Sequence, residues 1–483
     1  MNRWCGTRRA AVTRGVGRMG SLDEYYRARS LWLDGVPGSL EPRPSLPGDT
    51  DADVAIIGAG YTGLWTAYYL AAADPSLRIA VLEREIAGFG ASGRNGAWCS
   101  WLFAATYEQM ARHAGREAAI ATQREMFHTV DEVGRVAGEE GIDCGFVKGG
   151  AFMAATTPAH VASRKKEVDW YTSWGFSDDF HWLEKDAADE HIRVAGSLGA
   201  LYTPQCAAVD PARLARGLAE AVERRGSIIY ERTPVLSFAG GADGGTVTTA
   251  RGVVRATVVV LATEGYTVGA PGHHRDVLPM YSLMVATEPL PDDVWAQIGW
   301  SGRETFDDAR HLLIYASRTP DGRIALGGRG APYHYGSRIS DRFEREPAVF
   351  EALGRVIHDL FPATREARIT HRWGGPIGIP RDWYPGATFD QASGLAWAGG
   401  YAGDGVATSN LAGRTLADLI LRRDTDIVRL PWVQHRSRRW EPEPLRWLAS
   451  TFAVRMMAAA DEEERRTGAP SGKADMIMRL TGR

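Results

Sequence analysis

The spacing of apolar residues changes twice near the start of the chain, and this change predicts a strand, a helix and a second strand. Residues 53–57 form a short apolar run of β character, and residues 78–82 form another. Between them, apolar side chains recur at helical spacing over residues 64–73. A β-α-β unit of about 30 residues is typical of a nucleotide-binding fold.

Further along, helical and strand patterns alternate up to the C-terminus. Residues 35–50 contain four Pro and three Gly, and we expect them to be extended. Helical spacing covers residues 107–141, 210–225 and 406–421, and a helical tail follows within residues 426–483. Strands are expected at residues 228–231, in a hairpin over 245–262, and at 282–287, 311–317, 323–327 and 394–400.

A glycine-rich turn directly follows the first strand and precedes the first helix. Gly58 allows a tight turn, Gly60 lets backbone N–H groups approach a pyrophosphate, and Gly63 permits close packing of helix on sheet. Glu83 ends the second strand, 20 residues after Gly63, where a carboxylate can accept hydrogen bonds from ribose hydroxyls. Together these features predict a dinucleotide site; the alternative is a glycine-rich turn without a ligand.

A second glycine-rich loop distinguishes between the two common dinucleotides. It spans residues 88–96 and begins five residues after Glu83. An NAD domain has no particular use for such a loop. In a flavin enzyme it runs past the pyrophosphate towards the isoalloxazine ring, so the sequence favours FAD.

Several motifs carry a family resemblance. Residues 60–64 together with 92–96 resemble the gamma-glutamylputrescine oxidoreductase type within the superfamily of D-amino-acid oxidase, sarcosine oxidase and glycine oxidase. Similar motifs follow in the family's order at residues 210–218, 233–235, 260–266 and 399–406. The resemblance therefore extends over most of the chain, from about residue 50 to about residue 425.

The resemblance implies an FAD cofactor and a set of residues that bind it. These residues are Gly58, Gly60, Tyr61, Thr62, Gly63, Glu83, Arg84, Gly90, Ala91, Ser92, Arg94, Asn95, Gly96, Val235, Ala262, Thr263, Gly400, Gly403, Asp404, Gly405 and Val406. Some relatives bond the flavin to a histidine in the loop that contains Asn95, but this sequence has no His from 51 to 112. We therefore expect non-covalent FAD, and we expect Cys99 to be a small buried residue.

The resemblance also implies the class of reaction. A flavin enzyme of this superfamily removes hydride equivalents from the C–N bond of a small amine or amino acid, and the resulting imine hydrolyses to a carbonyl compound and an amine or ammonia. The protein holds the donor carbon in place and excludes water. The candidate catalytic residues are Trp373, Tyr401, Glu264 and Arg372, and further candidates for the substrate pocket are Tyr281, Tyr315, Arg318 and Arg329.

Each of these candidates has a plain alternative in core or surface packing. Glu264 stands where relatives often have Asn, and it could hold a substrate ammonium group. An arginine would be needed to hold a free carboxylate.

The electron acceptor stays open. Oxidases of the sarcosine type use a lysine near the flavin to speed the reaction with oxygen, but this sequence has no Lys between Lys185 and Lys473. We expect O2 to reoxidise the flavin, with a quinone or a carrier protein as the alternative. A C–O donor, and a role as the flavoprotein subunit of a larger complex, are further alternatives; residues 440–447 and the C-terminal helix could then form a partner surface.

The resemblance implies an α/β architecture of two interleaved domains. The Rossmann-like FAD-binding domain is expected to comprise residues 51–110, 195–275 and 372–425. The substrate domain, of α+β type on a mostly antiparallel sheet, is expected at 111–194 and 276–371. Residues 1–50 would be a tail and lead-in, and residues 426–483 a helical tail, with domain boundaries uncertain by ten residues or so.

Composition excludes several other classes. The 483 residues include 56 Lys and Arg against 59 Asp and Glu, a balance that gives no attraction to nucleic acid. No apolar run approaches the roughly 18 residues of a membrane span. The four Cys lie far apart without a C-x-x-C pair, so we expect no disulfide framework, no metal site and a cytoplasmic location. Residues 1–20 contain five Arg but no apolar segment follows, so a secretory signal is not expected; the substrate and any homo-oligomeric state stay open.

Overall fold

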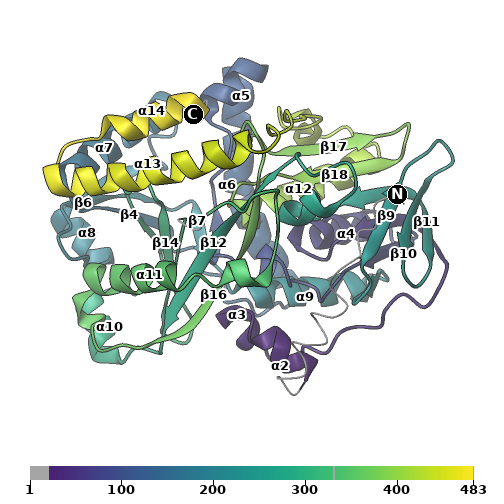
Figure 1. Ribbon diagram of the computed structural model, residues 1–483, viewed down its shortest axis with the longest axis horizontal. Helices are drawn as coiled ribbons and strands as arrows, with labels where there is room; N and C mark the ends of the chain where they lie inside the picture. The colour runs from purple at the N-terminus through teal and green to yellow at the C-terminus, as the bar shows by residue number, and fades with distance from the viewer. Residues whose placement is uncertain (1–20, 330–331, 482–483) are drawn as a thin grey trace.

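Two large β-sheets form the frame of the molecule (Figure 1). The computed structural model describes residues 21–329 and 332–481. The arginine-rich segment at residues 1–20, which we expect to be a tail, lies outside the described residues. Each sheet has eight strands, and a separate two-stranded ribbon pairs Trp98–Ser100 (β3) with Cys206–Ala208 (β7).

The first sheet contains the predicted β-α-β unit. Its strands are β1 (Thr50–Ile57), β2 (Ile79–Leu82), β8 (Ile228–Tyr230), β9 (Val235–Ala239), β10 (Gly245–Thr249), β11 (Val253–Leu261), β17 (Gly386–Asp390) and β18 (Leu395–Gly399). The order is β17-β18-β11-β1-β2-β8, and β10 and β9 extend from β11. Strand β1 pairs in parallel with β11 and β2, and its last four residues are all buried, because helices cover the parallel core of such a sheet.

Four helices pack together against this sheet. They are α4 (Tyr61–Ala73), α6 (Arg116–Glu139), α9 (Pro211–Arg224) and α12 (Gly405–Ile420). Helix α4 contacts both α12 and α9, and α12 also contacts α6. Asp210 caps α9 by accepting a hydrogen bond from the backbone N–H of Arg213, as Asp-Pro at a helix start predicts.

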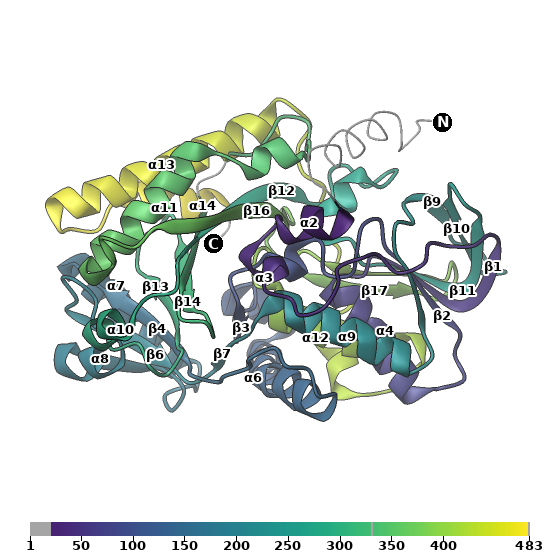
Figure 2. The ribbon, with the colours of Figure 1, turned by 90° about the horizontal axis from the view of Figure 1, so that it is seen from below.

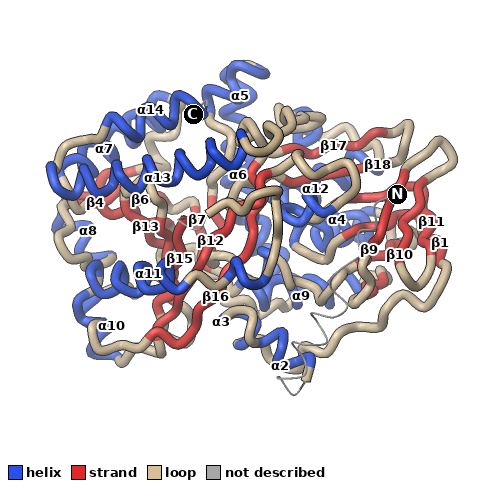
Figure 3. The backbone as a smooth tube through the Cα atoms, in the orientation of Figure 1, coloured by secondary structure: helices blue, strands red, loops and turns tan. Residues whose placement is uncertain are grey.

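The second sheet is antiparallel except for one pair. Its strands are β4 (Ala151–Ala155), β5 (His181–Glu184), β6 (Gly199–Thr203), β12 (Leu278–Thr287), β13 (Thr305–Asp308), β14 (Ile314–Arg318), β15 (Ile324–Arg329) and β16 (Ile369–Ile379). They run in the order β16-β12-β15-β14-β13-β4-β6-β5, and among these strands only β4 and β13 pair in parallel. Figure 3 shows the strands of this sheet with helices around them. The predicted α/β fold class, with its mostly antiparallel second sheet, is confirmed.

The remaining helices surround the second sheet or connect the two sheets. They are α5 (Tyr107–Ala114), α7 (Pro158–Ser173), α8 (Lys185–His191), α10 (Asp292–Ile298), α11 (Pro347–Leu360), α13 (Leu445–Thr467) and α14 (Gly472–Thr481). The predicted helical stretch at 107–141 is divided at Gly115, whose φ of 90° ends α5 before α6 begins. Within residues 21–329 and 332–481, no helix combines the length and apolar character needed to cross a membrane.

The predicted domain boundaries stay a prediction, but the strand pairing refines where each segment belongs. Strands β6 and β16 pair within the second sheet, although boundaries at 195 and 372 would place β6 and most of β16 in the flavin domain. Helix α6, expected in the substrate domain, packs on α12 and β3 beside the first sheet.

The lead-in segment is more structured than the sequence predicts. Residues expected to be a tail form two short helices, α2 (Leu22–Arg27) and α3 (Leu31–Asp34), each capped by a serine side chain. These helices lie where the two sheets meet, below β16 (Figure 2). Ser30 donates a hydrogen bond to the carbonyl of Gly93 at 2.8 Å, and the Trp32 indole donates to the carbonyl of Asn95 at 2.9 Å. The lead-in therefore holds the second glycine-rich loop in place through these two hydrogen bonds.

Replacing Trp32 with alanine tests this support. The Trp32 side chain is buried and meets Trp373 edge to face, so Trp32→Ala should cost about 3–5 kcal/mol and lower the Tm. Trp447→Ala is the matched control, because Trp447 is 37% exposed and its loss should lower the Tm far less. Equal Tm values for the two variants would contradict a structural role for the lead-in.

Candidate cofactor and active site

A cavity of about 410 Å³ opens at the carboxyl ends of β1, β2 and β11 and reaches the second sheet. Its lining includes Gly58, Gly60, Tyr61, Thr62, Glu83, Arg84, Phe89, Gly90, Ala91, Ser92, Asn95, Val235, Ala262, Thr263, Glu264, Tyr266, Ser337, Ile339, Pro376, Ile377, Tyr401, Gly403, Gly405 and Val406. Among the lining residues, only Glu83, Arg84 and Glu264 belong to charged types. The carboxyl edge of a parallel sheet is where dinucleotides bind in doubly wound folds.

The turn between β1 and α4 leaves no room for side chains. Gly58 has a φ of 106°, and a Cβ there would lie 2.5 Å from the carbonyl oxygen of Ala262. A Cβ at Gly63 would lie 2.0 Å from the carbonyl oxygen of Gly58. Gly60 precedes α4 and has no side chain to cap this helix, and of the N–H groups at this end that of Tyr61 donates to Ser92 Oγ at 2.8 Å. The N-terminus of α4 therefore faces the cavity, as the binding of a pyrophosphate requires.

Glu83 lies at one end of the cavity. Its Oε2 accepts a hydrogen bond from the N–H of Ala59 at 2.9 Å, and its Oε1 accepts from the N–H of Glu85 at 2.9 Å. Burial raises the pKa of the Glu83 carboxyl. Each carboxylate oxygen keeps a lone pair, so the group can still accept from a ribose diol.

The second glycine-rich loop forms a wall of the cavity and is held by its own side chains. Asn95 donates to the carbonyls of Ala91 and Ser92 and accepts from the N–H of Ala97. Ser92 Oγ accepts a hydrogen bond from the N–H of Tyr61 at 2.8 Å, which ties the loop to the start of α4. Cys99 is fully buried outside the cavity lining, and burial raises the pKa of its thiol far above the ordinary value.

Arg94, an expected cofactor residue, is not among the residues that line the cavity. Its buried guanidinium donates to the carbonyl of Gly374 at 3.0 Å and to the Tyr266 hydroxyl at 2.7 Å, and it pairs with Glu344 at 3.0 Å. Gly96 also lies outside the lining, because the ring of Tyr315 covers it. Arg94 thus joins the loop to the second domain.

Glu264 lies in the cavity wall at the junction of the two sheets. Its Oε2 accepts from the N–H of Gly378 in β16 at 2.8 Å, and its Oε1 accepts from the N–H of Tyr401 after β18 at 3.0 Å. Its φ of 43° is in the left-handed region. Burial raises the pKa of this carboxyl to about 7, against the opposing effect of the backbone N–H donors.

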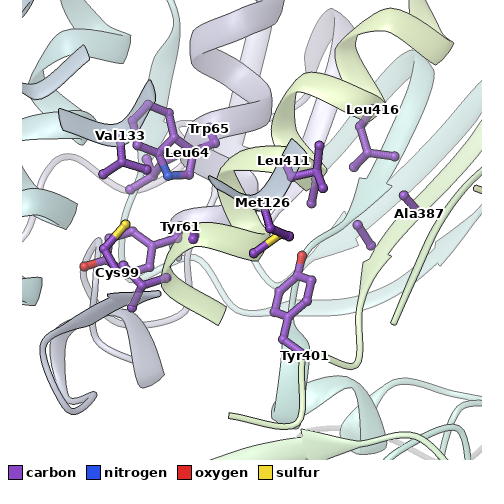
Figure 4. Packing of buried hydrophobic residues seen from close by; sticks show 14 of the residues in the cluster. Tyr61, Leu64, Trp65, Cys99, Met126, Val133, Ala387, Tyr401, Leu411 and Leu416 are labelled. Atoms are coloured by element: carbon purple, nitrogen blue, oxygen red, sulfur yellow. The ribbon is translucent and has the colours of Figure 1, made fainter. Parts of the chain in front are cut away.

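The late glycine motif brings a second helix N-terminus to the cavity. Gly403, Gly405 and Val406 line it where α12 begins, and no side chain caps that helix. Tyr401 points towards the buried cluster under the cavity (Figure 4), and its hydroxyl shares a hydrogen bond of 2.9 Å with Thr62. Gly63, Gly400 and Asp404 shape the backbone but are not among the lining residues.

Two of the four candidate catalytic residues lie outside the cavity lining. Arg372 is exposed on β16, and Trp373 is buried beside α3, where its indole donates to the carbonyl of Arg94 at 3.0 Å. Alternation along a strand turns these neighbours to opposite faces, so Trp373 packs against α3 while Arg372 faces solvent. Glu264 and Tyr401 do line it.

The other pocket candidates have structural partners. Tyr281 accepts a hydrogen bond from the N–H of Ser340, Tyr315 shares one with Ser282, and Arg318 stacks over Trp295. The side chain of Arg329 lies outside the described part of the chain. Sequence reasoning missed Phe89 and Tyr266, which lie inside motifs that it had singled out, and four lining residues from other segments, namely Ser337, Ile339, Pro376 and Ile377.

These features fit FAD. Two helix N-termini whose N-cap residues make no side-chain cap face one cavity, and a carboxylate stands at the end where the ribose of a dinucleotide would lie. Glycines that no other residue could replace bring the backbone close to the ligand. The opposite end has Pro376, Ile377 and Tyr401, which offer an apolar surface to a flat ring.

Comparison with known proteins gives the same result. The model of the DAO family, described as FAD dependent oxidoreductase, matches residues 53–419. Gamma-glutamylputrescine oxidoreductase of Escherichia coli (strain K12) is 28% identical over 388 residues, which cover 80% of this chain and 87% of that protein. The glycine oxidase of Geobacillus kaustophilus shares the fold with a TM-score of 0.66 at 23% identity, covering 80% of this chain and 99% of that one.

Replacing Gly63 with alanine tests the turn geometry. The new Cβ would collide with the Gly58 carbonyl, so Gly63→Ala should weaken FAD binding at least tenfold, measured by quenching of flavin fluorescence. Gly138→Ala is the control, because a Cβ at this helical glycine meets nothing within 4 Å and should stabilise α6 by roughly 0.5–1 kcal/mol. Unchanged FAD affinity in Gly63→Ala would contradict the role of this turn in bringing the N-terminus of α4 to the pyrophosphate.

The pH dependence of stability tests the buried Glu264. Because folding raises its pKa from the ordinary 4.5 to about 7, its contribution to stability is fully present below about pH 4.5 and is lost as the pH rises from there to about 7. Glu264→Gln stays neutral, so the Tm difference between variant and wild-type apoprotein should shift in favour of the variant as pH rises. Measuring the Tm of both proteins as the pH rises towards 7 would show this shift. Tm curves that stay parallel over that pH range would rule out a pKa of Glu264 raised by folding.

Proposed function

Because the chain belongs to the DAO family of FAD-dependent oxidoreductases, we propose that it oxidises the C–N bond of a small amine or amino acid. The observation that carries this proposal is the cavity. It extends from the glycine turn and the N-terminus of α4 at the first sheet to an apolar end at the second sheet. The names of two relatives, gamma-glutamylputrescine oxidoreductase and glycine oxidase, support an amine or amino acid as the donor.

The residues that would hold FAD have distinct tasks. The N-terminus of α4 with Gly60 would bind the pyrophosphate, and Glu83 would accept from the ribose hydroxyls. The N-terminus of α12 places a partial positive charge at the other end of the cavity. When bound, FAD would itself accept the two electrons taken from the donor.

The substrate would occupy the end of the cavity near Tyr401. There Pro376, Ile377 and Ile339 exclude water and can hold an apolar donor carbon in place. We assign the polar contacts with the amine to Glu264 and Tyr401, because both line the cavity at this end. The donor carbon loses hydride and the nitrogen loses a proton, and the imine takes up water to give a carbonyl compound and an amine or ammonia.

The acceptor that takes the electrons from the reduced flavin is a further part of the proposal. We propose O2, and we keep a quinone or a carrier protein as the alternative, because the chain has no Lys between Lys185 and Lys473 that could promote the reaction with oxygen. A C–O donor is the alternative for the substrate.

Anaerobic stopped-flow spectroscopy of the FAD-loaded protein tests the proposal. The panel comprises putrescine and its acyl derivatives, N-methyl amino acids, D-amino acids and glycerol phosphate. Bleaching of the flavin absorbance by one of the amines, with release of an amine or ammonia, is the expected result. Admission of air then separates the acceptors: recovery within seconds supports O2, and slow recovery that a quinone accelerates supports the alternative. Bleaching by glycerol phosphate alone would overturn the assignment to C–N bonds.

A further inference from the structure

Helix α13 presents an apolar stripe to the outside of the molecule. Leu445, Leu448 and Phe452 follow one another at helical spacing and are 57%, 51% and 49% exposed. An amphipathic helix on a globular protein normally turns such a stripe towards the core. Here the buried face instead carries Arg446, Ala460 and Glu464.

Aromatic side chains extend the stripe into a patch. Trp447 is 37% exposed and Tyr335 is 49% exposed, and their rings lie 6.5 Å apart. We call Tyr335, Leu445, Trp447, Leu448 and Phe452 the α13 patch. It contains five of the nine large hydrophobic side chains that are exposed in the described part of the chain. Single exposed hydrophobic residues need no explanation, but a cluster of them marks a contact surface.

The α13 patch lies beside the cavity. Tyr335 belongs to the loop whose Ser337 and Ile339 line the cavity. The same loop is attached to the start of α13, because Glu443 accepts from the Tyr333 hydroxyl at 2.6 Å and from the N–H of Gly336 at 2.8 Å. Helix α13 crosses the outside of the second sheet (Figures 1 and 2) and lies beyond residue 419, where the family match ends.

Two arginines lie next to the α13 patch, and the acid nearest to it in sequence, Glu443, pairs with Arg446 at 3.2 Å. Arg455 follows Phe452 by one turn of the helix, and Arg338 donates to the carbonyl of Tyr335 at 3.1 Å. Residues 445–460 contain no acid. The acids further along α13 are already bonded: for example, Asp461 accepts from the N–H of His311, and Glu462 pairs with Arg465.

An exposed apolar patch with arginines beside it favours one kind of partner. In a two-fold dimer the patch would face a copy of itself, and residues 445–460 of that copy would offer no acid to pair with Arg455. An anionic bilayer offers acyl chains to Leu448 and Phe452, a headgroup region to Trp447 and Tyr335, and phosphates to the arginines. We propose that the α13 patch docks the protein on an anionic lipid surface, with the cavity beside the membrane. This proposal does not depend on the substrate.

Co-sedimentation of the full-length, FAD-loaded protein with vesicles tests the docking. The protein should bind vesicles of phosphatidylcholine with phosphatidylglycerol more tightly than vesicles of phosphatidylcholine alone. Leu448→Glu with Phe452→Glu should reduce binding by roughly tenfold for each side chain. Arg455→Glu should reduce binding to the anionic vesicles only. Ile228→Glu is the control, because Ile228 is 53% exposed on β8 of the first sheet, and it should bind like the wild type.

The possible results separate lipid from protein partners. All variants should retain bound FAD, which confirms that they fold. Failure of the wild type to bind anionic vesicles at low salt, or equal binding by the double variant, would overturn the proposal. A wild-type dimer in light scattering that the double variant converts to a monomer, without any vesicle binding, would also overturn it and assign the patch to a second copy.

Discussion

The contact between helix α4 and the turn before it determines where the site lies. A Cβ at Gly63 would stand 2.0 Å from the Gly58 carbonyl oxygen, so only glycine allows the helix to start this close to the end of β1. That approach directs the N-terminus of α4 at the carboxyl edge of the first sheet, next to Glu83 after β2. Because α12 packs against α4, its N-terminus opens on the same cavity. The cofactor site thus follows from one backbone contact, around which the charged groups are arranged.

Two buried charged residues attach the second sheet to this cofactor site. Arg94 connects the second glycine-rich loop to Glu344, and Glu264 connects β16 to the segment after β18. Burying such groups is costly unless each finds partners, and both have several. These bonds hold Pro376 and Ile377 across the cavity from the glycine turn, so that segments around both sheets line one cavity.

The local parts of this design could be predicted from the sequence. The glycine turn, Glu83 and the strands around them are encoded by adjacent residues of fixed period, and all appear where expected. The direction of Arg94 could not be predicted, because its partner Glu344 lies 250 residues further along. Arg372 and Trp373 were expected at the site under the family resemblance, but in β16 Arg372 is exposed and Trp373 is buried against Trp32 of α3. Helices α2 and α3 were missed, although Ser21 and Ser30 can cap a helix start and residues 21–34 contain no proline.

The central claim is that this cavity holds FAD without a covalent bond. The most direct measurement is the visible spectrum of the purified protein, followed by the spectrum of the supernatant after acid precipitation. The account predicts flavin bands in the native protein and release of a single FAD per chain into the supernatant, because Asn95 occupies the loop and Cys99 is buried outside the lining. A protein that takes up no FAD, or a flavin that stays with the precipitated chain, would contradict it.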